Sequence, residues 1–190
     1  GLRVVAGPDD RGGTVLEGHR GRLTAAAFSP DGSRLAAVDV QGSMGLWDCG
    51  DGRLLLRCGK KQGTMRFAFS PNGARLAVVT LDGDASREVQ LYDAAEGRQL
   101  SSVPIRKGQG PSDWLVAFSP DGDRLVTASH EQDLHVWNVA TGERLASLRG
   151  HEAIVTALAF SPDGAQIASA AANGCIRLWR ADTYGVAREL

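Results

Sequence analysis

A fourfold internal repeat constrains the fold of this chain more than any other feature of its sequence. The segment AFSPDG, written AFSPNG in its second copy, occurs four times, and its phenylalanines are Phe28, Phe69, Phe118 and Phe160. Their spacings are 41, 49 and 42 residues. A period of about 40 residues is typical of architectures in which one small unit stacks on the next.

Two further landmarks keep the same register. An aromatic residue follows the phenylalanine after 19, 23, 19 and 19 residues, in the segments GLWD, QLYD, HVWN and RLWR: Trp47, Tyr92, Trp137 and Trp179. Nine residues before the phenylalanine, directly after a glycine, stand His19, Lys60, Gln109 and His151. Three landmarks in nearly constant register across four copies establish the repeat.

Each copy is predicted to form four short antiparallel strands. In the last copy, IVTALAF indicates a buried strand. SPDG indicates a tight turn, because proline suits its first central position and glycine accepts a positive φ. QIASAA, NG and CIRLW then predict a second strand, a hairpin turn and a third strand, and a fourth strand follows in each copy. Four such strands in about 40 residues describe a β-propeller blade, which needs neighbours to cover its faces.

The Gly-His pairs, the FSPDG turns and the Trp-Asp of GLWD resemble the WD-repeat family over essentially the whole chain. The resemblance implies an all-β propeller of four-stranded antiparallel blades, with four full blades and a two-stranded partial blade at the N-terminus. The expected units are a partial blade (1–18), blade one (19–58), blade two (59–107), blade three (108–149) and blade four (150–190). This predicts an incomplete or open ring, whose open blade edges favour self-association.

Blade two departs from the common length. Four extra residues lie in LDGDASREV, between its second and third strands, which are predicted over 75–80 and 88–92. Functional residues favour loops on a rigid scaffold, so the insertion at 82–88 is a candidate partner contact.

The family resemblance also implies a buried chain of hydrogen bonds in each blade, from a histidine through a serine or threonine and an aspartate to the tryptophan. A buried indole N–H and an imidazole both need partners. By position, blade four offers His151, Ser169, Asn173 and Trp179, blade three offers Thr127 and Trp137, and blade one offers His19 and Trp47. No blade holds the full set, since Ala37 and Gln41 interrupt blade one and Val78 interrupts blade two.

Enzymatic and metal-binding interpretations have little support in these residues. His151 and Ser169 would suit a base and a nucleophile only in an open pocket with an oxyanion site, and here they are predicted to be internal. The histidines lack converging carboxylate or thiol ligands, so no metal or cofactor is expected. Cys49, Cys58 and Cys175 have no paired spacing and are predicted to be free thiols.

Charge placement is the best functional clue. With 21 basic and 22 acidic residues the net charge is −1, which disfavours general attraction to nucleic acid or to anionic membranes. In this family the loops from a fourth strand to the next first strand lie on one face, the top. The resemblance thus assigns to a top rim the candidate partner-binding residues Arg20, Arg22, Lys60, Lys61, Arg66, Arg106, Lys107 and Arg149. Met65 and Trp114 are large apolar residues at the same strand position in blades two and three, and they are either further binding anchors on this rim or fillers of a blade interface. Acidic residues gather in the loops of the opposite face.

The class of function follows from the resemblance. We expect a non-catalytic scaffold that presents its rim to a protein or peptide, with an acidic or phosphorylated peptide as one candidate partner. A propeller-based enzyme and a nucleic-acid-binding module are the alternatives. The repeats are rich in alanine, glycine and arginine and contain FSPDG, and in this they resemble bacterial members of the family. This suggests a cytoplasmic protein that is part of a larger signalling or regulatory polypeptide.

Overall fold

The computed structural model describes residues 2–4, 14–16, 22–59, 66–82, 86–105, 115–128 and 132–190. The predicted all-β architecture is confirmed: the described residues form strands and turns, and no helix occurs among them. Four antiparallel sheets of four strands each follow one another along the chain, after a two-stranded sheet at its start. In each four-stranded sheet every strand pairs with the next strand in the sequence.

We call the four-stranded sheets blades one to four in chain order. The two-stranded sheet holds β1 (Leu2–Val4) and β2 (Thr14–Leu16). Blade one holds β3 (Leu23–Phe28), β4 (Arg34–Asp39), β5 (Met44–Asp48) and β6 (Leu54–Cys58). Blade two holds β7 (Arg66–Phe69), β8 (Arg75–Asp82), β9 (Ser86–Asp93) and β10 (Gln99–Ile105). Blade three holds β11 (Leu115–Phe118), β12 (Arg124–Ala128), β13 (Leu134–Asn138) and β14 (Arg144–Leu148). Blade four holds β15 (Val155–Phe160), β16 (Gln166–Ala171), β17 (Ile176–Arg180) and β18 (Val186–Glu189).

The repeated SPDG turn has the predicted chemistry. In the first copy, the amide of Gly32 donates to the Ser29 carbonyl at 2.8 Å, and Gly32 has a φ of +73°. The Asp31 carboxylate accepts hydrogen bonds from the Ser29 hydroxyl at 2.5 Å and from the Ser33 amide at 3.1 Å. The Ser29 and Ser33 bonds lower the pKa of Asp31 to about 2. The aspartates of this turn therefore serve the turn itself.

The extra residues of blade two lengthen a hairpin. β8 and β9 each have eight residues, and their pairing continues to Asp82 opposite Ser86. The strands predicted over 75–80 and 88–92 are thus longer than expected. Most of the segment 82–88 is built into the sheet, and residues 83–85 lie outside the described residues.

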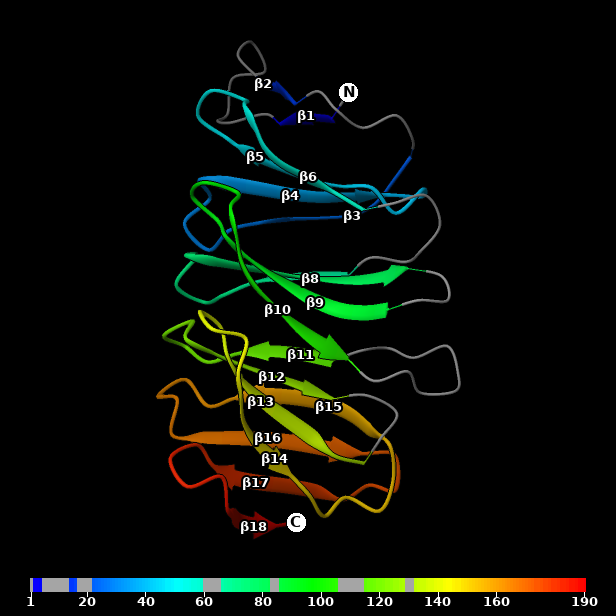
Figure 1. Ribbon diagram of the computed structural model, residues 1–190, viewed down its shortest axis with the longest axis vertical. Helices are drawn as coiled ribbons and strands as arrows, with labels where there is room; N and C mark the ends of the chain where they lie inside the picture. Colours follow the sequence, from blue (N-terminus) through cyan, green and yellow to red (C-terminus); the bar gives the residue numbers. More distant parts are fainter. Residues whose placement is uncertain are drawn as a thin grey trace.

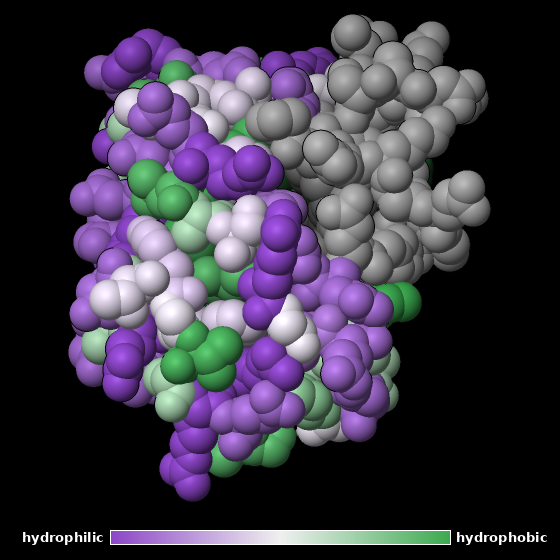
Figure 2. Space-filling view, turned by 60° about the horizontal axis from the view of Figure 1, so that its bottom comes forward, coloured by the Kyte–Doolittle hydropathy of each residue, from purple (hydrophilic) through white to green (hydrophobic). Residues whose placement is uncertain are grey.

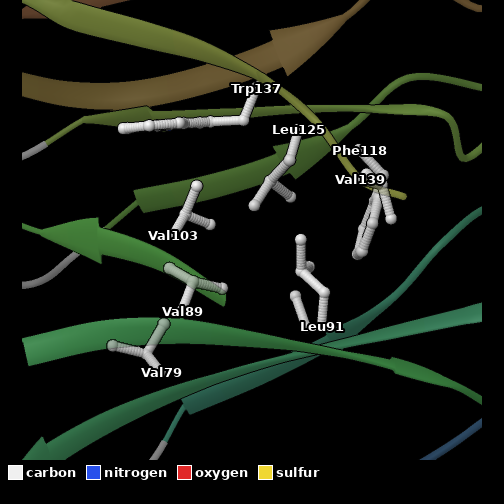
Figure 3. Close-up of a cluster of buried hydrophobic side chains, with 9 residues drawn as sticks. Val79, Val89, Leu91, Val103, Phe118, Leu125, Trp137 and Val139 are labelled. Carbon is white, nitrogen blue, oxygen red and sulfur yellow. The ribbon is translucent and has the colours of Figure 1, made fainter. Parts of the chain in front are cut away.

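The blades stack along the long axis of the molecule, with the β1–β2 sheet at one end and β18 at the other (Figure 1). Each blade packs one face against the following blade. Between blades two and three, Val79, Val89, Leu91 and Val103 meet Phe118, Leu125, Trp137 and Val139 in one buried cluster. Figure 3 shows these side chains pointing toward one another from the two sheets. Similar buried clusters join blade one to blade two and blade three to blade four.

None of the described residues belongs to a helix that could cross a membrane.

Candidate interaction surface

Blade four contains a sealed polar network around its tryptophan. The Trp179 indole donates from Nε1 to the Ser169 hydroxyl at 2.8 Å, and His151 Nε2 lies 2.6 Å from the same oxygen. The His151 ring meets the indole edge-on, with the ring centres 6.1 Å apart. His151 is 3% exposed and Ser169 1% exposed. The structure thus brings three of the four predicted residues of this blade together, away from solvent.

Asn173, the fourth residue predicted for this network, does not join it. Its side-chain oxygen accepts a hydrogen bond from the Cys175 amide at 3.2 Å, and the residue is exposed. The prediction for Asn173 is therefore corrected: the short NG turn between β16 and β17 uses this side chain locally. Among the described residues, buried His151 Nδ1 has no hydrogen-bond partner.

Burial sets the protonation of His151. Desolvation lowers the pKa of His151, and the nearby Arg177 guanidinium lowers it further, against a smaller opposing effect of Glu189. Arg177 itself pairs with Glu189 at 2.8 Å. The imidazole is consequently held in its neutral form, which suits a structural acceptor or donor beside Ser169.

In the other blades, different residues surround the aromatic side chain at the position of Trp179. In blade three, Trp137 Nε1 donates to the Thr127 hydroxyl at 2.9 Å. In blade two, where Val78 replaces the hydroxyl residue, the Tyr92 hydroxyl donates to the Gln90 side chain at 2.7 Å. Burial raises the pKa of the Tyr92 phenol and also that of the adjacent Cys58 thiol, the latter to about 11. Trp47 of blade one is buried, and His19 lies outside the described residues.

Sequence reasoning missed the residue that stands two positions before each aromatic residue. In all four blades this residue lies beside the ring or within the polar network: Gly45, Gln90, His135 and Arg177. His135 meets the Trp137 ring edge-on at 5.9 Å and bonds Ser147 at 3.0 Å. The signal was present in the strand register, because positions two apart point to the same face of a strand.

Most of the proposed top rim lies outside the described residues, namely Arg20, Lys60, Lys61, Met65, Arg106, Lys107 and Trp114. Arg66 is described in its backbone, where it starts β7. Arg22 is exposed directly before β3. Arg149 is exposed after β14, and its guanidinium lies 3.2 Å from Asp133. Arg22 and Arg149 are the rim cations that the structure shows at the surface.

The outer face of blade four is open. Leu134 and Leu148 of blade three, paired across β13 and β14, are 0% and 1% exposed because blade four covers them. Their counterparts in blade four, Ile176 and Leu190, also pair with each other but are 40% and 59% exposed. Figure 2, which brings this end of the molecule forward, shows hydrophobic patches among hydrophilic ones.

Within the described parts of the chain, no three histidine, cysteine or acidic side chains come close enough to hold a metal ion. Cys49, Cys58 and Cys175 are free thiols.

Comparison with known proteins agrees with this architecture. The family model "WD domain, G-beta repeat" matches residues 13–48, 105–138 and 142–180, together more than half of the chain. The chain therefore belongs to the WD-repeat family.

Individual relatives are distant and longer. The chain is 28% identical to human striatin-4 over 181 residues, which is 93% of this chain and 24% of striatin-4. It is 30% identical to periodic tryptophan protein 2 of Saccharomyces cerevisiae over 164 residues, covering 86% of this chain and 17% of that protein. It is 26% identical to nuclear distribution protein nudF 1 of Talaromyces marneffei over 140 residues, covering 74% and 30%. The chain thus spans less than a third of each of these relatives.

Proposed function

We propose that this chain is a non-catalytic scaffold that binds a protein or peptide through its exposed rim. The observation that carries the proposal is that the reactive side chains are buried whereas the charged side chains are exposed. The best nucleophile and base pair in the described chain, Ser169 and His151, is sealed and bonded to Trp179. The charged groups, in contrast, lie on exposed turns of a rigid stack of sheets, where a partner can reach them.

Membership of the WD-repeat family supports this class of function. The acidic nature of the partner is a further part of the proposal, and it rests on the exposed cations Arg22 and Arg149. Arginine favours carboxylates and phosphates because its guanidinium offers paired donors. We also propose that the protein is cytoplasmic and that this chain is part of a larger signalling or regulatory polypeptide.

Charge reversal at the rim tests the proposal. The substitutions Arg22→Glu and Arg149→Glu should together weaken binding of an acidic partner peptide at least tenfold in a calorimetric titration. Arg57→Glu is the matched control, because Arg57 is also an exposed arginine and lies on the outer strand of blade one. Equal weakening by the control would contradict a specific rim. Turnover of an ester by the purified chain, abolished by His151→Ala without unfolding, would contradict the non-catalytic assignment.

Self-association through the open face of blade four is a second candidate role. The exposed Ile176 and Leu190 favour it, since the same positions are covered on blade three. Four strands about 4.8 Å apart and about 17 Å long present only roughly 300 Å² of flat face. A stable complex of two proteins buries about 1,200–2,000 Å² in total. We therefore expect weak, concentration-dependent dimers in light scattering, which Ile176→Asp abolishes; a dimer unaffected by Ile176→Asp would overturn this role.

A further inference from the structure

An arginine–aspartate pair recurs where the second and third strands of a blade lie opposite each other. In blade one, Arg34 faces Asp48, and the guanidinium lies 2.9 Å from the carboxylate. In blade two, Arg75 faces Asp93 at 3.0 Å. In these two blades the chain therefore neutralises its own arginine.

Blades three and four lose the acid of this pair. In blade three, Asn138 stands opposite Arg124, so the cation has no carboxylate across the strand pair. Like Arg34, whose Nε donates to the Ala94 carbonyl of blade two at 3.2 Å, Arg124 reaches the next blade: its Nη1 donates to the Ala181 carbonyl at 2.7 Å. Its guanidinium also lies over the Phe160 ring at 5.7 Å. In blade four, Gln166 on β16 takes the place of the arginine, and Arg180 on β17 takes the place of the aspartate.

These two changes meet in one surface hollow between blades three and four. The hollow has a volume of about 380 Å³ and is lined by Arg124, Gly164, Ala165, Gln166, Arg180, Ala181 and Asp182. Within the described chain neither Arg124 nor Arg180 forms a close ion pair of the kind seen in blades one and two.

The acidic groups around the hollow are bound to their own loops. Asp182 accepts a hydrogen bond from the Thr183 amide at 2.6 Å. That bond is the main reason that the pKa of Asp182 is lowered, and Arg180 has a smaller effect. Asp121 and Asp163 accept hydrogen bonds from Ser119 and Ser161 in their own turns. The hollow therefore combines two arginines and an amide with one lining carboxylate.

We propose that this hollow binds the side-chain carboxylate of an acidic peptide. The peptide would supply the acid that blades one and two carry as Asp48 and Asp93. Arg180 would offer paired N–H donors to the carboxylate, with Arg124 adding positive charge and the Gln166 amide a further donor. This inference rests on the proposed binding of an acidic partner, but assigns it a site apart from the rim cations Arg22 and Arg149.

The double substitution Gln166→Arg with Arg180→Asp tests the site while keeping the fold. It rebuilds the pair that Arg34–Asp48 and Arg75–Asp93 form in the first two blades, so the hollow supplies its own acid. The probe is an acetylated hexaglutamate peptide, titrated into the ¹⁵N-labelled full chain at low salt. For the unaltered chain we expect saturable shifts of the Gly164, Ala165 and Ala181 amides. We expect at least tenfold weaker binding in the double variant and unchanged binding in Arg57→Asp.

The outcomes separate this site from the rim. Shifts lost in the double variant but kept in Arg149→Glu support the hollow and count against the rim. Binding lost in Arg149→Glu but kept in the double variant supports the rim and overturns the hollow. The absence of shifts at Gly164, Ala165 and Ala181 overturns the inference. Inorganic phosphate that binds the same amides as tightly as the peptide overturns the assignment to a peptide carboxylate.

Discussion

Blade four and blade one each bury a tryptophan at the equivalent position, but different residues lie beside the two rings. In blade four, the Trp179 indole donates to Ser169, which also contacts His151. In blade one, Ala37 stands where blade four has Ser169, and Gly45 lies directly against the Trp47 ring. A Cβ on Gly45 would lie 2.2 Å from the indole. The comparison teaches that the residues beside the indole differ between blades: a polar network lies there in blade four, and in blade one the lack of a Cβ at Gly45 leaves room for the ring.

The largest effect should come from removing an indole. Trp179→Ala should lower the free energy of unfolding by about 3–5 kcal/mol, because it leaves a cavity and also strands the hydrogen-bonding groups of Ser169 and His151. Urea unfolding followed by circular dichroism measures the loss. Val186→Ala is the control, since Val186 is about half exposed on the outer strand of the same blade. Wild-type stability of Trp179→Ala would contradict its place in the blade core.

Blade one should be sensitive to the volume of the side chain at position 45. Gly45→Ala should cost up to about 3 kcal/mol, because the new methyl group overlaps the Trp47 ring and forces the indole out of its packed position. Gly185→Ala is the matched control, since its added Cβ would meet only the Thr183 hydroxyl at 3.7 Å. The shift of the urea unfolding midpoint, with an unchanged slope, measures the change in stability. Equal urea midpoints for the two variants would show that the packing of Trp47 does not depend on Gly45.

Blade four should be sensitive to a lost hydroxyl. Ser169→Ala should cost about 2 kcal/mol, because it leaves both the indole N–H and His151 Nε2 without this partner in a buried place. Thr127→Ala in blade three removes the single bond from Trp137, so its effect should be smaller. Thermal unfolding of both variants gives the comparison. A greater loss for Thr127→Ala would reverse the order expected from the hydrogen bonds.

Sequence alone predicts the strands well because the turns that bound them carry their own chemistry. The SPDG segment holds its aspartate and glycine through contacts within four residues, as at Ser29, Asp31 and Gly32. The networks depend on side-chain direction across strands instead. Asn173 was therefore expected beside His151, although its amide serves the NG turn, and Gln90 was missed as the partner of Tyr92. The hollow at Arg124 and Arg180 was likewise hidden, since it lies between two blades.

The smallest effect should be a dependence of stability on pH that belongs to blade four. The pKa of His151 is lowered from its ordinary value of 6.5, first by burial and then by Arg177. Below that value the unfolded chain binds a proton that the folded chain resists, so stability falls as the pH is lowered. Between about pH 7.5 and about pH 5.5, the free energy of unfolding should fall less in His151→Asn than in the unaltered chain. Urea unfolding at both pH values measures the difference.

The pH dependence of stability distinguishes blade four from blade one. Asp31, Asp48, Asp121, Asp163 and Asp182 also have lowered pKa values, but they titrate below their ordinary value of 3.8, outside the window of the experiment. Gly45→Ala in blade one leaves His151 in place, so it should lower stability equally at both pH values. If Gly45→Ala and His151→Asn changed the pH dependence alike, the histidine network would not be the source of the acid sensitivity.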